Sequence, residues 1–291
     1  MKPSPFAYHA PRTSEEAVGL LAELGDEAKA LAGGQSLVPM LSLRLAFFDH
    51  LVDVGRMDEI RGIERRDGSL WVGAGTTDAA VGRSPEVAAA VPLLTRATPF
   101  VGHFQVRNRG TIGGSIAHAD PAAEYPAVAL ALDATMEALS PRGRRTIPAA
   151  DFFTGLWDTA LEPDELLTGI RFPVREGRSG FAVEEFARRH GDFAIAGATV
   201  AVTLDEQDRV RRCAIGLIGL GPTPRRAAAA EAEATGRAVA DVDADALGRA
   251  AVAGLDEVTA DLQGSADYRR RVGAAMVTRA WGTACEEARR G

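Results

Sequence analysis

The first regular pattern in the chain is a run of apolar residues spaced three and four positions apart between residues 17 and 24. This spacing is typical of one face of an amphipathic helix. Thr13 precedes the run, and Glu16 lies three positions after Thr13, which is the arrangement of a capping box. Gly25 directly follows the last apolar residue and is suited to end a helix. The pattern therefore predicts a helix between Thr13 and Gly25.

Strand-like and helix-like segments alternate along the first half of the chain. Apolar runs at residues 28–33 and 50–54 predict short strands, the first of which leads into a Gly-Gly pair. Two β-type runs flank Asp67 and Gly68, a dipeptide that favours a hairpin turn. Four further helices are expected: over residues 37–45, after Thr77, within residues 92–101, and from Pro121 with Asp120 as its cap. Two strands are expected, one on each side of residues 140–145. Pro126 would lie inside the helix after Asp120, so a later start and a bend both remain open.

The pattern changes after a charged, glycine-rich segment at residues 174–180. Three strand-like runs follow, and the polar turn between the second and third favours an antiparallel meander. These runs cover residues 180–189, 194–210 and 211–221. Alanine-rich sequence then predicts three helices, over residues 226–235, 243–254 and 266–289. We therefore expect two domains, residues 1–176 and a small α+β unit over residues 177–291.

Composition narrows the classes of function. A length of 291 residues favours two domains, and a net charge of −7 disfavours non-specific binding to nucleic acid or to an anionic membrane. No apolar run is long enough to cross a bilayer, and the N-terminus lacks the apolar stretch of a signal peptide, so a cytoplasmic location is expected. Cys213 and Cys285 are far apart and are interpreted as small buried hydrophobic residues, not as metal ligands. The histidines show no metal-ligand spacing, so we expect no metal site.

Two Gly-Gly pairs stand in similar surroundings, "LAGGQSL" at residues 31–37 and "TIGGSIA" at residues 111–117. Glycine can adopt positive φ and lets the backbone approach a ligand closely, and successive N–H groups in such a turn can bind an anion. Hydroxyl groups flank both pairs and add donors. Two such turns that converge would suit a diphosphate, whereas each alone is more often a structural turn. Neither segment carries the lysine of a P-loop, and the "GLIGLG" stretch lacks Rossmann spacing and is interpreted as a closely packed strand end.

Five motifs occur in the order found in a known family. The chain resembles the FAD-binding medium subunit of molybdenum hydroxylases, a group that includes aerobic carbon monoxide dehydrogenase and the flavin domain of xanthine dehydrogenase. The resemblance implies an α+β fold: a two-subdomain FAD-binding domain of vanillyl-alcohol-oxidase (PCMH) type, then a small domain with a three-stranded antiparallel sheet and a helical bundle. The motifs are "LAGGQSL", "TIGGSIAHADPAAEYPAVALALDA", "ELLTGIRFP", "RRHGDFAIAGATV" and "IGLIGLGPTPRRAAAAE".

The resemblance implies that the two glycine segments hold the FAD diphosphate from opposite sides. Gln35 stands where some relatives have histidine, and its carboxamide lacks a nucleophilic ring nitrogen, so non-covalent FAD is expected. Many relatives have asparagine where this chain has Ser115, so a contact made through that side chain does not carry over. The residues implied are Ala32, Gly33, Gly34, Gln35, Ser36 and Leu37 in the first segment, and Thr111, Gly113, Gly114 and Ser115 in the second.

Three further residues match cofactor-binding positions of the family. Glu124 matches an acidic residue that bonds to the ribose or ribityl hydroxyls, although a solvated helix carboxylate is equally compatible with the sequence. Leu167 matches a residue that lines the flavin or adenine pocket, with plain core as the alternative. Phe193 falls where some relatives place an aromatic ring near the isoalloxazine, again with core as the alternative. His118 is a candidate proton donor or a local hydrogen-bonding residue, and we assign no catalytic residue.

The implied function is electron transfer within a complex. A large molybdenum subunit would oxidise the substrate, and a small subunit would pass electrons from two [2Fe–2S] clusters to FAD on this chain. The resemblance implies a dimer of heterotrimers as the assembly. The external acceptor would be a quinone, NAD or oxygen. Two alternatives remain: a self-contained flavin-dependent oxidase or dehydrogenase, and a non-catalytic scaffold. Carbon monoxide, N-heterocycles, nicotine-like compounds and aldehydes all remain open as substrates of the complex.

Overall fold

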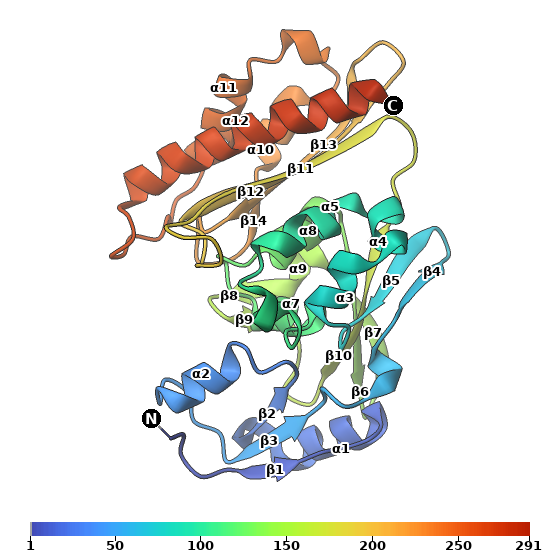
Figure 1. Cartoon of the computed structure of the whole chain (residues 1–291), viewed down its shortest axis with the longest axis vertical. Helices are drawn as coiled ribbons and strands as arrows, with labels where there is room; N and C mark the ends of the chain where they lie inside the picture. The colour runs from blue at the N-terminus through green and yellow to red at the C-terminus, as the bar shows by residue number, and fades with distance from the viewer. Residues whose placement is uncertain (1) are drawn as a thin grey trace.

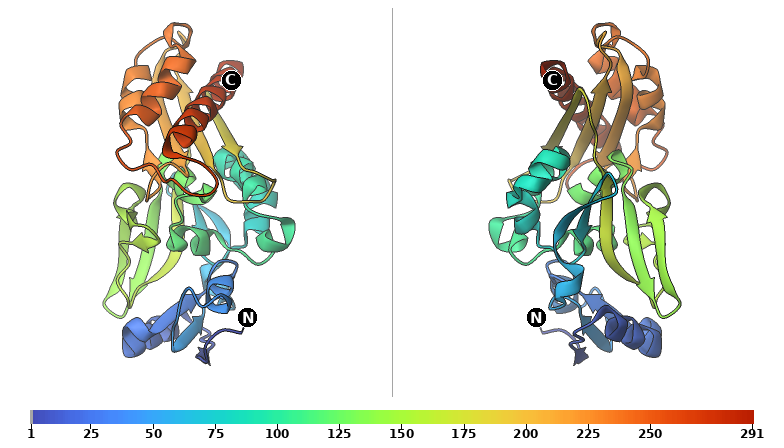
Figure 2. Two further views of the ribbon diagram at one scale, coloured as in Figure 1. Left: turned by 90° about the vertical axis from the view of Figure 1, so that its left-hand side faces the viewer. Right: turned by 90° about the vertical axis from the view of Figure 1, so that its right-hand side faces the viewer.

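A computed structural model describes residues 2–291. The molecule is elongated, with the N-terminal elements at one end and the helices of the C-terminal part at the other (Figures 1 and 2). A connecting segment, residues 174–178, separates the last strand of the first part from the first strand of the second. No helix within residues 2–291 combines the length and apolar character that a membrane crossing requires.

The N-terminal end is a small α/β layer. Helix α1 (Ser14–Leu24) begins as predicted, because the Thr13 hydroxyl accepts a hydrogen bond from the N–H of Glu16 at 3.1 Å, and Gly25 ends it. It packs beside three parallel strands in the order β1-β3-β2. The strands are β1 (Ala7–His9), β2 (Ala28–Leu31) and β3 (His50–Asp53), and the short helix α2 (Leu37–Ser42) lies between the last two in sequence.

The second subdomain is an antiparallel sheet of five strands with helices against it. Its strand order is β4-β5-β10-β6-β7, and the β4–β5 hairpin turns at Asp67 and Gly68 as predicted. The strands are β4 (Ile63–Arg66), β5 (Ser69–Gly73), β6 (Thr135–Ser140), β7 (Gly143–Pro148) and β10 (Leu166–Pro173), and the pair β8 (Phe153–Gly155) and β9 (Asp158–Thr159) forms a separate ribbon. The helices are α3 (Asp78–Arg83), α4 (Pro85–Ala90), α5 (Pro92–Ala97), α6 (Phe104–Arg107), α7 (Ile112–His118), α8 (Glu124–Ala131) and α9 (Ala149–Phe152).

Helix α8 begins later than the sequence pattern suggested. The Asp120 carboxylate accepts a hydrogen bond from the N–H of Ala122 at 2.8 Å, so Asp120 makes a tight turn and does not cap a helix. The helix starts at Glu124. Pro126 is therefore its third residue, where the missing N–H would have had no intrahelical acceptor. The later start was one of the two alternatives that Pro126 left open.

The C-terminal part is a sheet with helices on one face. The predicted antiparallel meander is present, and a two-residue strand adds a fourth member in the order β11-β12-β13-β14, so the expectation of three strands was one short. The strands are β11 (Ser179–Phe186), β12 (Ala196–Leu204), β13 (Val210–Ile218) and β14 (Arg225–Arg226). The three predicted helices are α10 (Ala228–Ala234), α11 (Ala244–Ala253) and α12 (Ala266–Arg290). Cys213 and Cys285 are both buried and free, as predicted.

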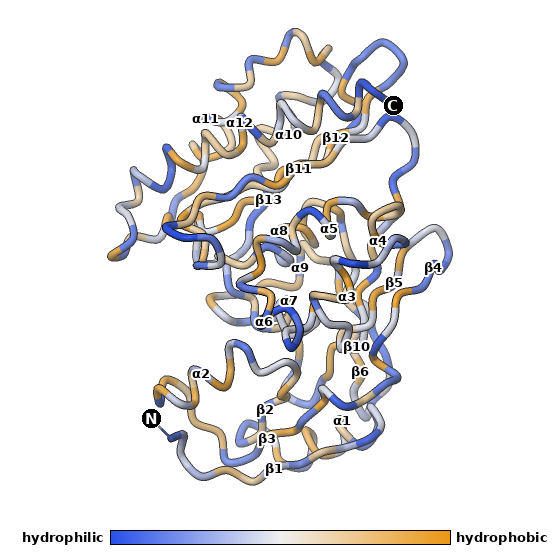
Figure 3. Tube along the Cα trace, viewed as in Figure 1, coloured by the Kyte–Doolittle hydropathy of each residue, from blue (hydrophilic) through white to orange (hydrophobic). Residues whose placement is uncertain are grey.

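Helix α8 joins the two parts. Each of its eight residues is buried, and it packs against β12 and β13 from below, where hydrophobic segments gather (Figure 3). Residues of the C-terminal sheet, such as Val183 and Ala201, belong to the same hydrophobic cluster as the N-terminal core. The Arg96 guanidinium of α5 also donates to the Glu287 carboxylate of α12 at 2.6 Å. The two parts therefore share a continuous core.

Candidate functional site

The two glycine segments meet in space. A Cβ added to Gly33 would overlap the carbonyl oxygen of Arg109 and lie 2.7 Å from the Cα of Gly110. A Cβ added to Gly114 would lie 3.4 Å from the Cβ of Ala32. Any side chain at Gly33 would push the segments apart, so the absence of one is what permits this approach. The structure thus brings together the residues that the sequence paired.

The first segment presents unused donors. Gly34 has φ of 71°, a conformation that glycine adopts without strain, and the turn continues directly into α2. Within residues 2–291 the N–H groups of Gly34, Gln35 and Ser36 find no acceptor. The Ser36 hydroxyl makes no capping bond to α2 either. The Gln35 carboxamide donates to the carbonyl of Gly33 at 3.0 Å. A concave turn with adjacent free amides is suited to an anion.

The second segment is helical, contrary to the expectation of a turn. Thr111 caps α7 by accepting from the N–H of Gly114 at 3.0 Å, and the N–H of Gly113 donates to Ala74 at 3.0 Å. The backbone of Ala74 passes so near that a Cβ on Gly113 would lie 2.6 Å from its Cα. The amides of Gly113 and Gly114 are therefore already bonded. The glycines of this segment let neighbouring backbone come close, and its available donors are the hydroxyls of Thr111 and Ser115, not main-chain amides.

Two buried carboxyl groups, those of Glu124 and Asp78, lie near the second glycine segment. Glu124 opens α8 and is 8% exposed, and burial raises its pKa to about 7. Asp78 opens α3 and is 2% exposed; burial, then the Glu124 charge, raise its pKa to about 7. Glu124 is therefore not a solvated helix carboxylate. Asp78 is not among the residues that the motifs singled out, although it directly follows a capping threonine in the sequence.

His118 ends α7 in an aromatic stack. Its ring lies parallel to the Trp157 indole, with centroids 6.1 Å apart and an angle of 10° between the planes. The Trp157 indole N–H also donates to the Asp120 carboxylate at 3.4 Å. Burial lowers the pKa of His118, and the Asp120 charge opposes that effect. His118 thus stacks on Trp157, and its burial favours the neutral imidazole.

Leu167 and Phe193 lie in different environments. Leu167 is 4% exposed and belongs to the cluster that contains Ile112 and Ile116 of α7, so it supports α7 from the core. Phe193 is 61% exposed in the loop between β11 and β12, which excludes the core alternative. That loop contacts the N-terminal part, because a Cβ on Gly191 would lie 2.6 Å from the His103 ring.

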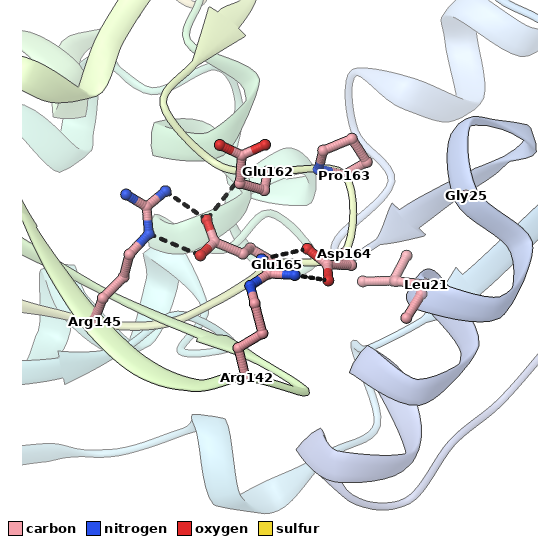
Figure 4. Close-up of a pocket in the computed structure, with 9 residues that line it drawn as sticks. Leu21, Gly25, Arg142, Arg145, Glu162, Pro163, Asp164 and Glu165 are labelled. Atoms are coloured by element: carbon pink, nitrogen blue, oxygen red, sulfur yellow. Dashed lines mark hydrogen bonds and ion pairs between the residues drawn. The ribbon is translucent and has the colours of Figure 1, made fainter.

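A cavity of about 610 Å³ lies away from the glycine segments, between α1 and the β6–β7 hairpin (Figure 4). Four of its five charged side chains form two pairs, with Glu162 as the fifth: Arg142 donates to Asp164 at 2.8 Å, and Arg145 to Glu165 at 2.7 Å. This cavity therefore offers a ligand no unpaired charge from these two pairs. In the part of the chain that the structure describes, no cluster of three or more His, Cys, Asp or Glu side chains could hold a metal ion.

Models of two protein families match the chain. The model described as the FAD binding domain in molybdopterin dehydrogenase matches residues 4–175. The model described as the CO dehydrogenase flavoprotein C-terminal domain matches residues 181–284. Together they cover nearly all of the sequence, and they follow the same order as the two structural parts.

Individual relatives match over the full length. The carbon monoxide dehydrogenase medium chain of Hydrogenophaga pseudoflava is 41% identical over 280 residues, which cover 96% of this chain and 97% of that one. The 6-hydroxypseudooxynicotine dehydrogenase complex subunit alpha of Paenarthrobacter nicotinovorans is 42% identical over 99% of this chain and 97% of its own. A solved structure of carbon monoxide dehydrogenase from Hydrogenophaga pseudoflava superposes with a TM-score of 0.96 at 42% identity, and covers 99% of both chains.

Proposed function

The chain belongs to the family of FAD-binding medium subunits of molybdopterin dehydrogenases, and on that premise we propose that it is the electron-transfer subunit of a molybdenum hydroxylase complex. It would receive electrons from the [2Fe–2S] clusters of a small partner subunit and deliver them to an external quinone, NAD or oxygen. A large partner subunit would carry the molybdenum cofactor. The observation that carries this proposal is the meeting of Gly33 with the backbone of residues 109–110.

The residues present fit FAD. The free amides of Gly34, Gln35 and Ser36 would bind the diphosphate from one side, while Thr111 and Ser115 would donate their hydroxyls from the other. The neighbouring residues Ala32, Gly33, Leu37, Gly113 and Gly114 would complete the two walls. Because Gly114 approaches Ala32 so closely, a diphosphate would reach both segments without an intervening side chain.

The protein's own tasks are binding and orientation. Bound FAD would supply the exchange of one or two electrons at a time. Glu124, buried at the start of α8, would accept hydrogen bonds from ribose or ribityl hydroxyls. Phe193 would place its exposed ring against the isoalloxazine. Gln35 carries no nucleophilic nitrogen, so FAD would be held without a covalent bond.

The division of labour between the two parts supports this role. We place the domain boundary between residues 176 and 177, inside the connecting segment that follows β10. The first domain carries both glycine segments, and the second brings the loop with Phe193 toward His103.

Two relatives of nearly equal identity to this chain are named after different compounds. One name gives carbon monoxide and the other 6-hydroxypseudooxynicotine. We therefore assign the choice of substrate to the large partner subunit.

The proposal is tested on the native complex, purified through a tag on this chain. Acid precipitation should release about one FAD per chain into the supernatant, and the co-purified polypeptides should contain molybdenum, iron and acid-labile sulfide. A chain that retains no flavin would be a scaffold. A chain that carries flavin and turns over a substrate without metal-containing partners would be a self-contained oxidase. Either result would overturn the electron-transfer proposal.

A further inference from the structure

Asp78 is a buried carboxyl group with one oxygen that nothing in the protein satisfies. It is 2% exposed, and its Oδ1 has no hydrogen-bond partner within residues 2–291. Its N–H donates to the carbonyl of Gly110 at 3.0 Å. A Cβ on Gly110 would overlap Asp78 Oδ2, so the backbone that leads into Thr111 lies directly on this carboxyl group. An orphaned buried oxygen at such a position requires an explanation.

The groups that face Asp78 provide little positive charge. Glu124 of α8 is a second buried carboxyl group, and Tyr125 beside it bonds to the Thr98 hydroxyl at 2.9 Å. Arg107 of α6 is the nearby cation, but its guanidinium donates to main-chain carbonyls, among them that of Gly102 at 2.7 Å. Asp120 adds further negative charge close to Glu124, and Glu185 is another buried carboxyl group that faces it. Two adjacent buried carboxylates without a paired cation cannot both be ionised at low cost.

A bound diphosphate would increase this negative charge. The proposed FAD site lies at Thr111–Ser115, directly after the Gly110 backbone that Asp78 supports. An ionised Asp78 would repel the diphosphate through a poorly screened interior. A protonated Asp78 would remove that repulsion, and its hydroxyl could donate a hydrogen bond where the ionised group could only accept.

We propose that Asp78 is a positioning residue that must be a neutral carboxylic acid for FAD to bind, and that its ionisation links FAD affinity to pH. This inference rests on the proposed function, because it takes FAD as the ligand of the glycine segments. Burial first, and the Glu124 charge second, place the pKa of Asp78 at about 7, with Arg107 acting in the opposite direction. Affinity for FAD should therefore be highest below neutrality and fall as the pH rises.

The test is a titration of the flavin-free full chain with FAD, followed by the quenching of flavin fluorescence between about pH 6 and about pH 9. For the wild type, the dissociation constant should rise by up to about tenfold per pH unit above the pKa, because one proton must be taken up on binding. The isosteric variant Asp78→Asn, which cannot ionise, should show a clearly shallower fall in affinity over the same range, because only the second buried carboxyl group, Glu124, still titrates there. The surface variant Asp26→Asn serves as control and should follow the wild type.

Each outcome separates the two proposals. Constant affinity in the wild type, or an unchanged slope in Asp78→Asn, overturns the role of Asp78 and leaves the proposed function standing. A wild-type chain that binds no FAD at any pH overturns the proposed function and this link with it. If Asp78→Asn does not fold, Asp78→Ser, which suits the first turn of a helix, replaces it with the same expectation. Infrared difference spectra should also lose a protonated carboxyl band in the variant.

Discussion

Gly33 and Gly110 pack backbone against backbone, so that a Cβ on Gly33 would lie 2.7 Å from the Gly110 Cα. These residues are far apart in sequence and belong to different subdomains. Their contact determines how closely the two glycine segments approach each other, and it has a direct consequence for substitution at Gly33.

Gly33→Ala should weaken FAD binding at least tenfold and lower the free energy of unfolding by about 1–3 kcal/mol, because main-chain atoms cannot move aside as a flexible side chain would. Fluorescence titration and urea unfolding measure the two effects. Gly19→Ala in α1 is the matched control, since a Cβ there meets nothing within 4 Å. That variant should gain about 0.5–1 kcal/mol and bind FAD normally. Equal behaviour of both variants would contradict the role of the contact.

Thr111→Ala should affect both the fold and the cofactor. It removes the cap of α7, which costs about 1 kcal/mol, and it removes a hydroxyl proposed to bind the diphosphate. Thr13→Ala removes a cap of the same kind from α1, where the Thr13 hydroxyl accepts at 3.1 Å. It should lose similar stability, measured by urea unfolding, but keep its FAD. A Thr111→Ala variant with unchanged FAD affinity would argue against the proposed hydroxyl contact.

Gly180→Ala should separate α12 from β11. A Cβ at Gly180 would lie 2.8 Å from the Ala284 carbonyl carbon and 2.8 Å from the Ala288 nitrogen, so the helix would have to move. We expect a loss of about 1–3 kcal/mol in the free energy of unfolding. Gly282→Ala in the same helix faces open space and should instead gain about 0.5–1 kcal/mol. Thermal unfolding of the two variants distinguishes these directions.

Glu185 should make the protein less stable at alkaline pH. Burial raises its pKa to about 8 from an ordinary value of 4.5, and its Oε2 has no partner within residues 2–291. Between these values the unfolded chain holds fewer protons than the folded one, so stability falls as the pH rises. Glu185→Gln should therefore gain about 2 kcal/mol relative to the wild type near pH 9, and little near pH 5. Urea unfolding of both proteins at the two pH values checks the difference, and an equal gain at both would contradict the assignment.

Local signals in the sequence predicted the elements that local chemistry determines. The helix from Ser14 to Leu24 has its cap and its terminating glycine in adjacent residues. Asp67 and Gly68 take positive φ angles of 46° and 74°, which a tight hairpin turn between two strands requires. In both places the residues that specify the structure are neighbours in the chain, and they could be recognised without knowledge of the rest of the fold.

Features that depend on distant segments could not be predicted in this way. Gly113 and Gly114 lie in a helix, where the backbone of Ala74 closes against Gly113 and Ala32 lies near Gly114. The sequence around the pair records neither approach. Asp78 is buried because the Gly110 backbone covers it, so the sequence pattern showed only a polar residue after a capping threonine. The resemblance to the family indicated that the two glycine segments act together. It did not indicate that the buried carboxyl groups of Asp78 and Glu124 near the second segment have raised pKa values.

The absence of a solvent face on α8 restricts how this protein can be recombined with its relatives. The first domain contacts one side of the helix and the C-terminal sheet the other, while its first residue is Glu124 of the proposed FAD site. A chimaera that exchanges the C-terminal domain alone would place an unfamiliar sheet surface on α8 and could shift that carboxyl group. A chimaera should fold when α8 and the C-terminal sheet come from the same relative. The segment to exchange therefore includes α8 and extends across the domain boundary.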